Sequence, residues 1–199
     1  MSSEALVQCE SFFGEVVGVT DEELARTLDE AAAETALKKG DRPLTRGEVP
    51  TTVHFLASGV ARSFSFDADG HEVTDCIVWR PGSVLAPTPE LGDPSIATVE
   101  MLTDGTVVSV GLPLIARLLE TSLPANHLYI RLLSEAWREH WTARRIVSQM
   151  RARDRYLWFL ETHPGLIDEV PNKYVASLLG MTPVTLSRLR GELRDEQEG

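Results

Sequence analysis

The sequence predicts an α+β protein in which an antiparallel β-barrel is followed by helices. Between about residues 34 and 112, short runs of alternating apolar and polar residues are separated by turn sequences. Closely spaced strands of this kind are typical of an antiparallel sandwich or barrel. After Pro113 the apolar residues recur at helical spacing, and residues 170–193 read as two short helices around a turn. We therefore expect a barrel, a long helix and a helix-turn-helix, in that order.

One helix is predicted before the barrel, over residues 20–33. Thr20 is a suitable N-cap, and Glu23 stands three residues later, as in a capping box. Within the barrel segment, the clearest pairing is a hairpin of residues 60–66 with residues 72–78. The Asp-Ala-Asp-Gly sequence at 67–70 supplies the turn chemistry that such a hairpin needs.

The helical part begins with a short helix over residues 114–119 and a long one over residues 124–150. The long helix has an apolar stripe at alternating spacings of three and four residues, interrupted by His140 and Arg144. A stripe of this length favours packing against a partner helix, and helix-turn-helix proteins dimerise to read paired half-sites. Packing on the protein's own barrel is the alternative. A further amphipathic helix is expected over residues 151–163.

The strongest functional pattern is VPNKYVASLLGMTPVTLSRLRGEL at residues 170–193. Gly180 stands where the chain must turn, with a positive φ expected. Thr182 is a suitable N-cap, and Pro183 falls at the first helical position, where its missing N–H costs nothing. In the second helix we expect Leu186, Leu189 and either Val184 or Thr185 to face inward, with these side chains facing out: Ser187, Arg188 and Arg190.

The formal net charge of −11 is unevenly distributed. Residues 1–130 hold 8 basic and 20 acidic side chains, whereas residues 131–199 hold 11 and 10. Because attraction to phosphates supplies most non-specific DNA affinity, we expect that affinity to be weak and salt-sensitive. The acidic segment, residues 1–130, should face away from a DNA duplex.

Several other classes of protein are disfavoured. Two distant cysteines, Cys9 and Cys76, fit a reducing cytoplasm and argue against a zinc ribbon or a disulfide scaffold. We see no signal peptide and no apolar run long enough to span a membrane. The five histidines lack metal-ligand spacing, and neither a P-loop nor a GxSxG motif occurs. We therefore predict no metal site and no enzyme; a cupin-like enzyme would need clustered ligands that this barrel segment lacks.

The order of these elements, together with short sequence pieces, resembles the Crp/Fnr family of bacterial transcription regulators. The pieces are residues 55–63 (FLASGVARS), 69–74 (DGHEVT), 79–83 (WRPGS), 97–102 (ATVEML), 154–156 (DRY) and the helix-turn-helix. The resemblance covers about residues 22–193. It implies a jelly-roll sensor domain, similar to a cyclic nucleotide-binding domain, with a dimerising helix and a C-terminal winged helix. In many members a small effector in the barrel changes the DNA competence of the dimer.

The chain departs from the family in two places. Cyclic nucleotide-binding members carry a Glu and a later Arg that binds the phosphate, but here Ser95 stands roughly where that Arg belongs. Since neither Lys nor Arg occurs between Arg80 and Arg117, a cyclic nucleotide is disfavoured. The loop is expected to bind a less anionic effector or no effector at all. The residues expected to contact such an effector are Val84, Leu85, Glu90, Leu91, Ser95 and Ile96. Second, only six residues follow Leu193, so we expect a truncated winged helix without its wing.

By the family pattern, Pro183, Val184, Ser187 and Arg188 are aimed at base edges, and Arg188 is the strong reader of guanine. The remaining expected DNA contacts go to the phosphate backbone, from Lys173, Thr182, Thr185 and Arg190. We predict three parts: residues 1–123 as helix and effector-sensing barrel, 124–150 as dimerisation helix and 151–199 as DNA-binding domain. The expected function is that of a cytoplasmic homodimer that binds double-stranded DNA and regulates transcription. The alternative is a ligand-binding or protein-interaction module with a degenerate DNA-binding domain.

Overall fold

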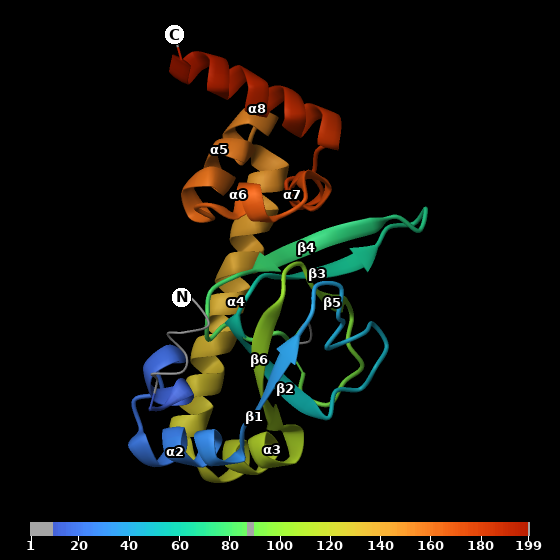
Figure 1. Ribbon diagram of the computed structural model, residues 1–199. Helices are drawn as coiled ribbons and strands as arrows, with labels where there is room; N and C mark the ends of the chain where they lie inside the picture. Colours follow the sequence, from blue (N-terminus) through green and yellow to red (C-terminus); the bar gives the residue numbers. More distant parts are fainter. Residues whose placement is uncertain (1–9, 87–89, 199) are drawn as a thin grey trace. The chain divides into compact units, whose positions relative to one another are not determined.

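The computed structural model describes residues 10–86 and 90–198 (Figure 1). Its contacts divide the chain into two compact units. The first, called here the barrel unit, holds the residues up to 65 and residues 76–135. The second, called the C-terminal unit, holds residues 66–75 and the chain from 136 onward. The helix α4, Leu123–Gln149, contributes residues to both units.

The barrel unit begins with a five-residue π-helix, η1 (Phe12–Val16), followed by α2 (Glu22–Ala31). The sequence predicted α2, but the predicted cap is wrong by one residue. Asp21, not Thr20, is the N-cap, because the Asp21 carboxylate accepts a hydrogen bond from the Leu24 N–H at 2.8 Å. Aspartate satisfies a free helix N–H as well as threonine does and also adds charge that favours the helix dipole.

Six β-strands form two antiparallel sheets in the described part of the barrel unit and the adjoining hairpin. One sheet has the order β1-β6-β2 and the other β4-β3-β5. This agrees with the predicted jelly-roll. The strand bounds are β1 Ala33–Leu37, β2 Thr52–Ser58, β3 Ala61–Phe66, β4 Glu72–Val78, β5 Thr98–Met101 and β6 Gly105–Gly111.

The hairpin predicted around residues 67–70 is confirmed as β3 and β4. Asp67 closes its turn, since one carboxylate oxygen accepts the N–H groups of both Asp69 and His71 at 2.9 Å. Gly70 takes a φ of 83°, which a side chain would oppose. The hydrogen bond from the His71 N–H contributes most to lowering the pKa of the Asp67 carboxyl.

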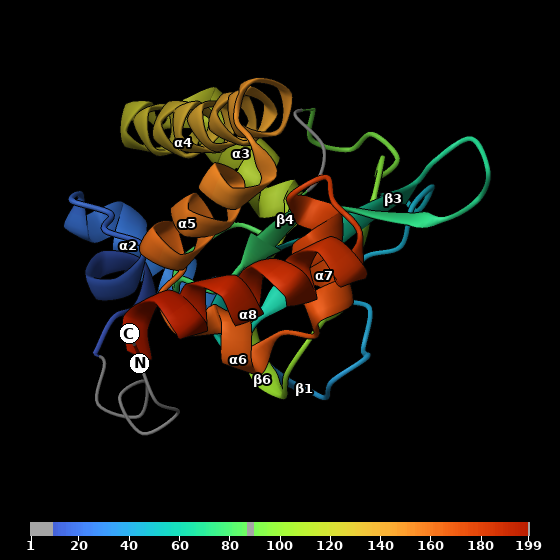
Figure 2. The same cartoon turned by 90° about the horizontal axis from the view of Figure 1, so that it is seen from above.

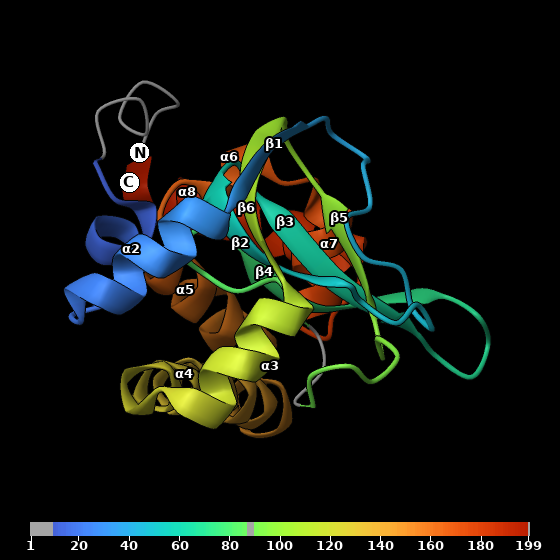
Figure 3. The same cartoon turned by 90° about the horizontal axis from the view of Figure 1, so that it is seen from below.

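Apolar side chains fill the space between the sheets. Leu56, Met101 and Val107 are at most 2% exposed and pack with Leu44, Ala61, Leu85 and Val99. A second cluster joins Phe13 and Phe55, whose rings meet edge to face at 5.1 Å, with Leu28 of α2. Figure 3 shows α2 and α3 (Leu112–Thr121) at the same end of the barrel unit. The helices α2 and α3 thus cover one end of the barrel core.

The sheet β4-β3-β5 also holds a buried ion pair. The guanidinium of Arg62 in β3 lies 2.6 Å from the Glu100 carboxylate in β5, directly across the register. The Arg62 side chain is 1% exposed, and its guanidinium lies 4.1 Å from the centre of the Phe64 ring. Since an arginine is rarely this buried without a partner, Glu100 explains how β3 tolerates a charge.

The C-terminal unit is helical except for residues 66–75. After α4 come α5 (Ala152–Thr162), α6 (Leu166–Glu169), α7 (Asn172–Leu178) and α8 (Pro183–Glu198). Figure 2 shows α8 beside α5 and α7, both of which it contacts. The sequence predicted these helices except α6, which is a single turn after Gly165. Among the described residues, no helix combines the length and apolar character that crossing a membrane requires.

Candidate nucleic-acid interface

The turn between α7 and α8 has the conformation that its sequence predicts. Gly180 has a φ of 60°. A Cβ at this position would lie 2.9 Å from a methyl carbon of Val147 and 3.2 Å from the Arg155 guanidinium. The turn is also held by a hydrogen bond from the Met181 N–H to the Ala176 carbonyl at 2.9 Å. Glycine is therefore required here both by backbone angle and by space.

Thr182 caps the start of α8. Its hydroxyl oxygen accepts the Thr185 N–H at 3.1 Å and lies 2.9 Å from the Thr185 hydroxyl. Pro183 follows as the first residue of the helix, as predicted. The free N–H groups of the first turn are thus partly satisfied within the chain, and the helix direction is fixed at its beginning.

One face of α8 packs against α7. Leu186 and Leu189 are at most 4% exposed, and Val175, Ala176 and Leu179 in and just after α7 are at most 1% exposed. Between the two inward candidates of the first turn, Thr185 is half-buried and Val184 is 79% exposed. The opposite face is solvent-exposed and carries Pro183, Val184, Ser187 and Arg188. The structure thus brings the four expected base readers together on one face.

Arg188 extends from this exposed face. Its side chain is 67% exposed and pairs with Glu192, one turn further along α8, at 3.1 Å. An exposed pair at this spacing contributes only a few tenths of a kcal/mol. Glu192 therefore orients the guanidinium without burying it, and Arg188 stays accessible to an external acceptor.

Arg190 is differently placed. One guanidinium nitrogen donates to the Asn172 side-chain oxygen at 2.8 Å and approaches the Ile167 carbonyl at 3.5 Å. The other lies 3.3 Å from Asp168. Arg190 thus connects α8 to α6 and α7, whereas the sequence assigned it to phosphate. Lys173, another expected backbone contact, is exposed, with its ammonium 4.6 Å from the centre of the Tyr174 ring.

Arg155 was not singled out as a site residue from the sequence. Arg155 of α5 donates to the carbonyl of Val147 at 3.3 Å and to that of Gly180 at 3.4 Å. It therefore joins the end of α4 to the turn of the helix-turn-helix. The only sequence signal for it was the Asp-Arg-Tyr piece at 154–156.

The tip of the β3–β4 hairpin also reaches the helix-turn-helix, within the C-terminal unit. The Thr74 N–H donates to the Ser177 hydroxyl of α7 at 2.9 Å, and Thr74 is 3% exposed. The two residues are 103 positions apart in the sequence, and no local pattern predicts such a contact.

At the hairpin turn, potential metal-binding atoms of Asp67, Asp69 and His71 lie within 4.8 Å of one another, but all three residues are exposed. The hydrogen bonds of Asp67 are those of a turn.

The structure places the six expected effector residues in unlike environments. Leu85 is 3% exposed and Ser95 is 2% exposed, whereas Glu90 is exposed and Ile96 is 65% exposed. Val84 and Leu91 are half-buried. The Ser95 hydroxyl donates to the Ala97 carbonyl at 2.6 Å, so it holds its own loop. Neither Lys nor Arg occurs between Arg80 and Arg117, and the side chains that pack around Leu85 in the described residues are apolar.

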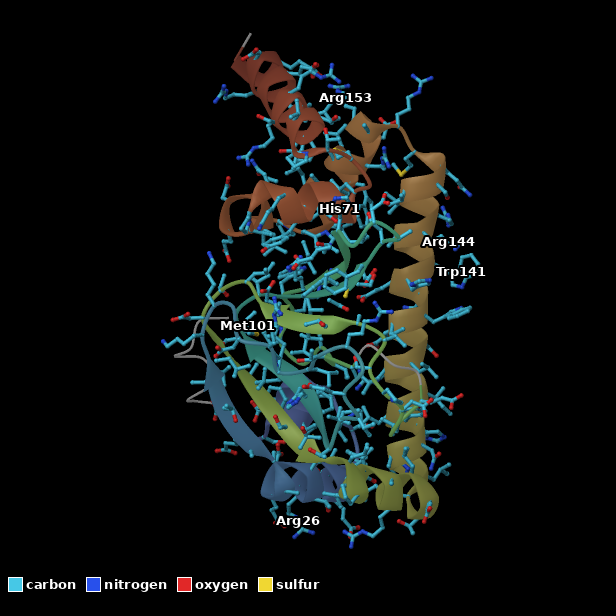
Figure 4. The ribbon with its side chains drawn as sticks, turned by 90° about the vertical axis from the view of Figure 1, so that its right-hand side faces the viewer. Arg26, His71, Met101, Trp141, Arg144 and Arg153 are labelled. Atoms are coloured by element: carbon cyan, nitrogen blue, oxygen red, sulfur yellow. The ribbon has the colours of Figure 1, made fainter. Side chains whose placement is uncertain are left out.

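The apolar stripe of α4 is exposed where it was predicted to meet a partner. Ile130, Trp137 and Trp141 are between 44% and 63% exposed, and Leu133 and Val147 are each 40% exposed. The rings of Trp137 and Trp141 meet edge to face at 5.7 Å. Figure 4 shows Trp141 and Arg144 projecting outward from α4.

Comparisons with known proteins agree with this architecture. Residues 34–122 match the model of the cyclic nucleotide-binding domain. No curated protein matches the sequence. Among solved structures, FixK2 from Bradyrhizobium japonicum is similar, with a TM-score of 0.73 and 18% identity, covering 83% of this chain and 86% of that chain.

Two further solved structures have the same fold. The regulator CLP of Xanthomonas campestris, described as responsive to c-di-GMP, has a TM-score of 0.69 and 13% identity, covering 87% of this chain and 91% of that chain. A Crp/Fnr-family regulator from Eubacterium rectale has a TM-score of 0.68 and 13% identity, covering 88% of this chain and 84% of that chain. Residues 34–122 are therefore similar to the cyclic nucleotide-binding domain, and the chain shares the fold of solved Crp/Fnr-family regulators.

Proposed function

We propose that this protein is a cytoplasmic transcription regulator that binds double-stranded DNA as a homodimer. One observation carries the proposal: the outer face of α8 is exposed at Pro183, Val184, Ser187 and Arg188, while the inner face is anchored by buried leucines. A helix held in this way and exposed at its N-terminal half is the element that helix-turn-helix proteins place in the major groove.

The proposed contacts divide into base reading and backbone positioning. Arg188 bonds guanine O6 and N7, and Ser187 reaches a base or a phosphate. Thr182, Thr185 and Lys173 contact the phosphate backbone, which sets the register of the helix on the duplex. Arg190 supports these contacts indirectly, because its guanidinium is bonded to Asn172 and Asp168.

The dimer forms through α4 in this proposal. The exposed apolar residues of α4 would leave a large hydrophobic stripe in water in a monomer, and such stripes mark protein interfaces. A second copy of the helix presents the same residues, which suits a two-fold interface. Two copies of α8 would then be available for paired half-sites.

For the barrel, we propose that an effector, where one is used, is not a cyclic nucleotide. The support is the lack of Lys and Arg between Arg80 and Arg117 and the internal hydrogen bond of Ser95. Calorimetric titration of the full-length protein with cyclic AMP and cyclic GMP should give no saturable heat. Saturable binding of either compound contradicts this part of the proposal.

DNA binding is tested by fluorescence anisotropy with a random duplex over a range of salt, followed by selection of a preferred site. A regulator shows binding that weakens as salt rises and recovers a specific sequence. Arg188→Ala should lose about 1–3 kcal/mol of specific affinity and relax one base position. The matched control is Arg194→Ala, an exposed arginine further along α8, which should keep the base preference. No salt-dependent binding would favour an interaction module with a degenerate DNA-binding domain.

A further inference from the structure

The first turn of α8 presents an apolar side chain to the outside. Val184 is 79% exposed, more than any other large hydrophobic residue in the part of the chain that the structure describes. The two residues that follow it turn inward, with Leu186 fully buried and Thr185 half-buried. A valine so exposed on the proposed reading face is available for contact with another molecule.

The two threonine hydroxyls nearest Val184 hydrogen-bond within the first turn of α8. The Thr182 hydroxyl oxygen accepts the Thr185 N–H, the two threonine hydroxyls lie 2.9 Å apart, and Pro183 has no N–H. The outward surface of this turn therefore consists mainly of the proline ring and the two valine methyl groups. A base facing it meets hydrocarbon rather than a hydrogen-bonding side chain.

Arg188 stands four residues after Val184 and is exposed on the same side of α8. Four residues of α-helix rise about 6 Å, whereas successive bases of one strand are about 3.4 Å apart. The two side chains can therefore face bases about two steps apart. One reader is a planar donor of hydrogen bonds and the other is purely apolar.

We propose that Val184 is a specificity-determining residue that contacts the C5-methyl group of a thymine about two base pairs from the guanine read by Arg188. The inference rests on the proposed DNA-binding function. In the major groove the methyl group distinguishes thymine, and apolar side chains read it by contact. Cytosine at the same position would place its amino group against the valine without an acceptor, which disfavours it.

The experiment removes only that methyl group. Full-length protein is used to select a preferred duplex, and each thymine of a half-site is then replaced singly by deoxyuridine. At one position, wild-type affinity should fall about 4-fold, which corresponds to the ~0.8 kcal/mol expected for one buried methylene-sized group. Val184→Ala should bind the thymine and deoxyuridine duplexes about equally, because the contact is already lost.

Val49→Ala is the matched control, since Val49 is a 57% exposed valine outside the helix-turn-helix; this variant should keep the 4-fold effect. Unchanged melting of Val184→Ala should show that the variant folds. The inference is overturned if a specific site is found but every deoxyuridine replacement is neutral, or if Val184→Ala keeps the full thymine preference. Failure to recover any specific site overturns the proposed function, and the inference with it.

Discussion

Arg190 of α8 donates a hydrogen bond of 2.8 Å to the side-chain oxygen of Asn172 in α7. This bond links α8 to the helix that precedes it. A charge-assisted hydrogen bond contributes more to stability than a neutral one. The position of α8 in the helix-turn-helix therefore depends on an arginine that the sequence alone assigned to DNA.

Replacing Arg190 should reduce stability more than it reduces DNA contact. Arg190→Ala is expected to lower the free energy of unfolding by about 1 kcal/mol, because the hydrogen bond to Asn172 is lost at a partly exposed site. Urea titration followed by circular dichroism measures this. Arg188→Ala is the control and should stay within about 0.5 kcal/mol of wild type. If Arg190→Ala has an unchanged urea midpoint of unfolding and a reduced salt dependence of DNA binding, Arg190 contacts phosphate as the sequence predicts.

The turn glycine and a helical glycine of the same unit should respond in opposite directions. Gly180→Ala forces a side chain into positive φ and toward Val147, which should cost about 1–3 kcal/mol. Gly191 lies inside α8, and a Cβ there meets no atom within 4 Å. Gly191→Ala should therefore stabilise the protein by about 0.5–1 kcal/mol. Thermal melting of both variants provides the comparison, and a wild-type melting temperature for Gly180→Ala would refute the account of the turn.

The proposed dimer should depend on the two tryptophans of α4. Truncating Trp137 or Trp141 to alanine is expected to weaken self-association by about 2 kcal/mol each, or roughly 30-fold, because aromatic anchors dominate interfaces. Sedimentation equilibrium measures the dissociation constant. Leu157→Ala, an exposed apolar position on α5, is the control and should not alter it. A wild-type protein that stays monomeric at high concentration would exclude this interface.

His54 should make the barrel unit sensitive to acid. Burial is the main cause that lowers the pKa of His54 below its ordinary value of 6.5, and its ring nitrogen lies 2.7 Å from the Ser109 hydroxyl. The folded state therefore binds this proton less readily than the unfolded state does. His54 contributes stability above about pH 6.5, and this contribution is lost as the pH falls from 6.5 through the lower folded-state pKa.

The measurement is the melting temperature at several values between pH 7.5 and pH 5. His54→Gln should flatten part of this dependence, because glutamine keeps a hydrogen-bonding group but does not titrate. His127→Gln, at an exposed site of α4, should leave the dependence unchanged. If His54→Gln follows the wild-type curve at all pH values, the histidine carries none of the acid sensitivity.

Local sequence patterns were enough to predict much of the secondary structure of this protein. The β3–β4 hairpin, the turn at Gly180, the cap at Thr182 and the buried leucines of α8 were all predicted from residues within a few positions of one another. The same patterns were wrong about the cap of α2, where Asp21 replaces Thr20, because two adjacent residues have nearly equal capping ability. They did not decide whether Val184 or Thr185 faces inward, because the periodicity of one helix does not show which neighbouring element covers it.

Long-range contacts were decided only by the tertiary structure. The pairing of Arg62 with Glu100, the bond of Arg190 to Asn172 and the contact of Thr74 with Ser177 join residues between 18 and 103 positions apart. Helix periodicity, turns and caps depend on neighbours within about four residues, so they can be read from the sequence. A charge buried or bonded across elements depends on register and packing, and these exist only once the elements have come together.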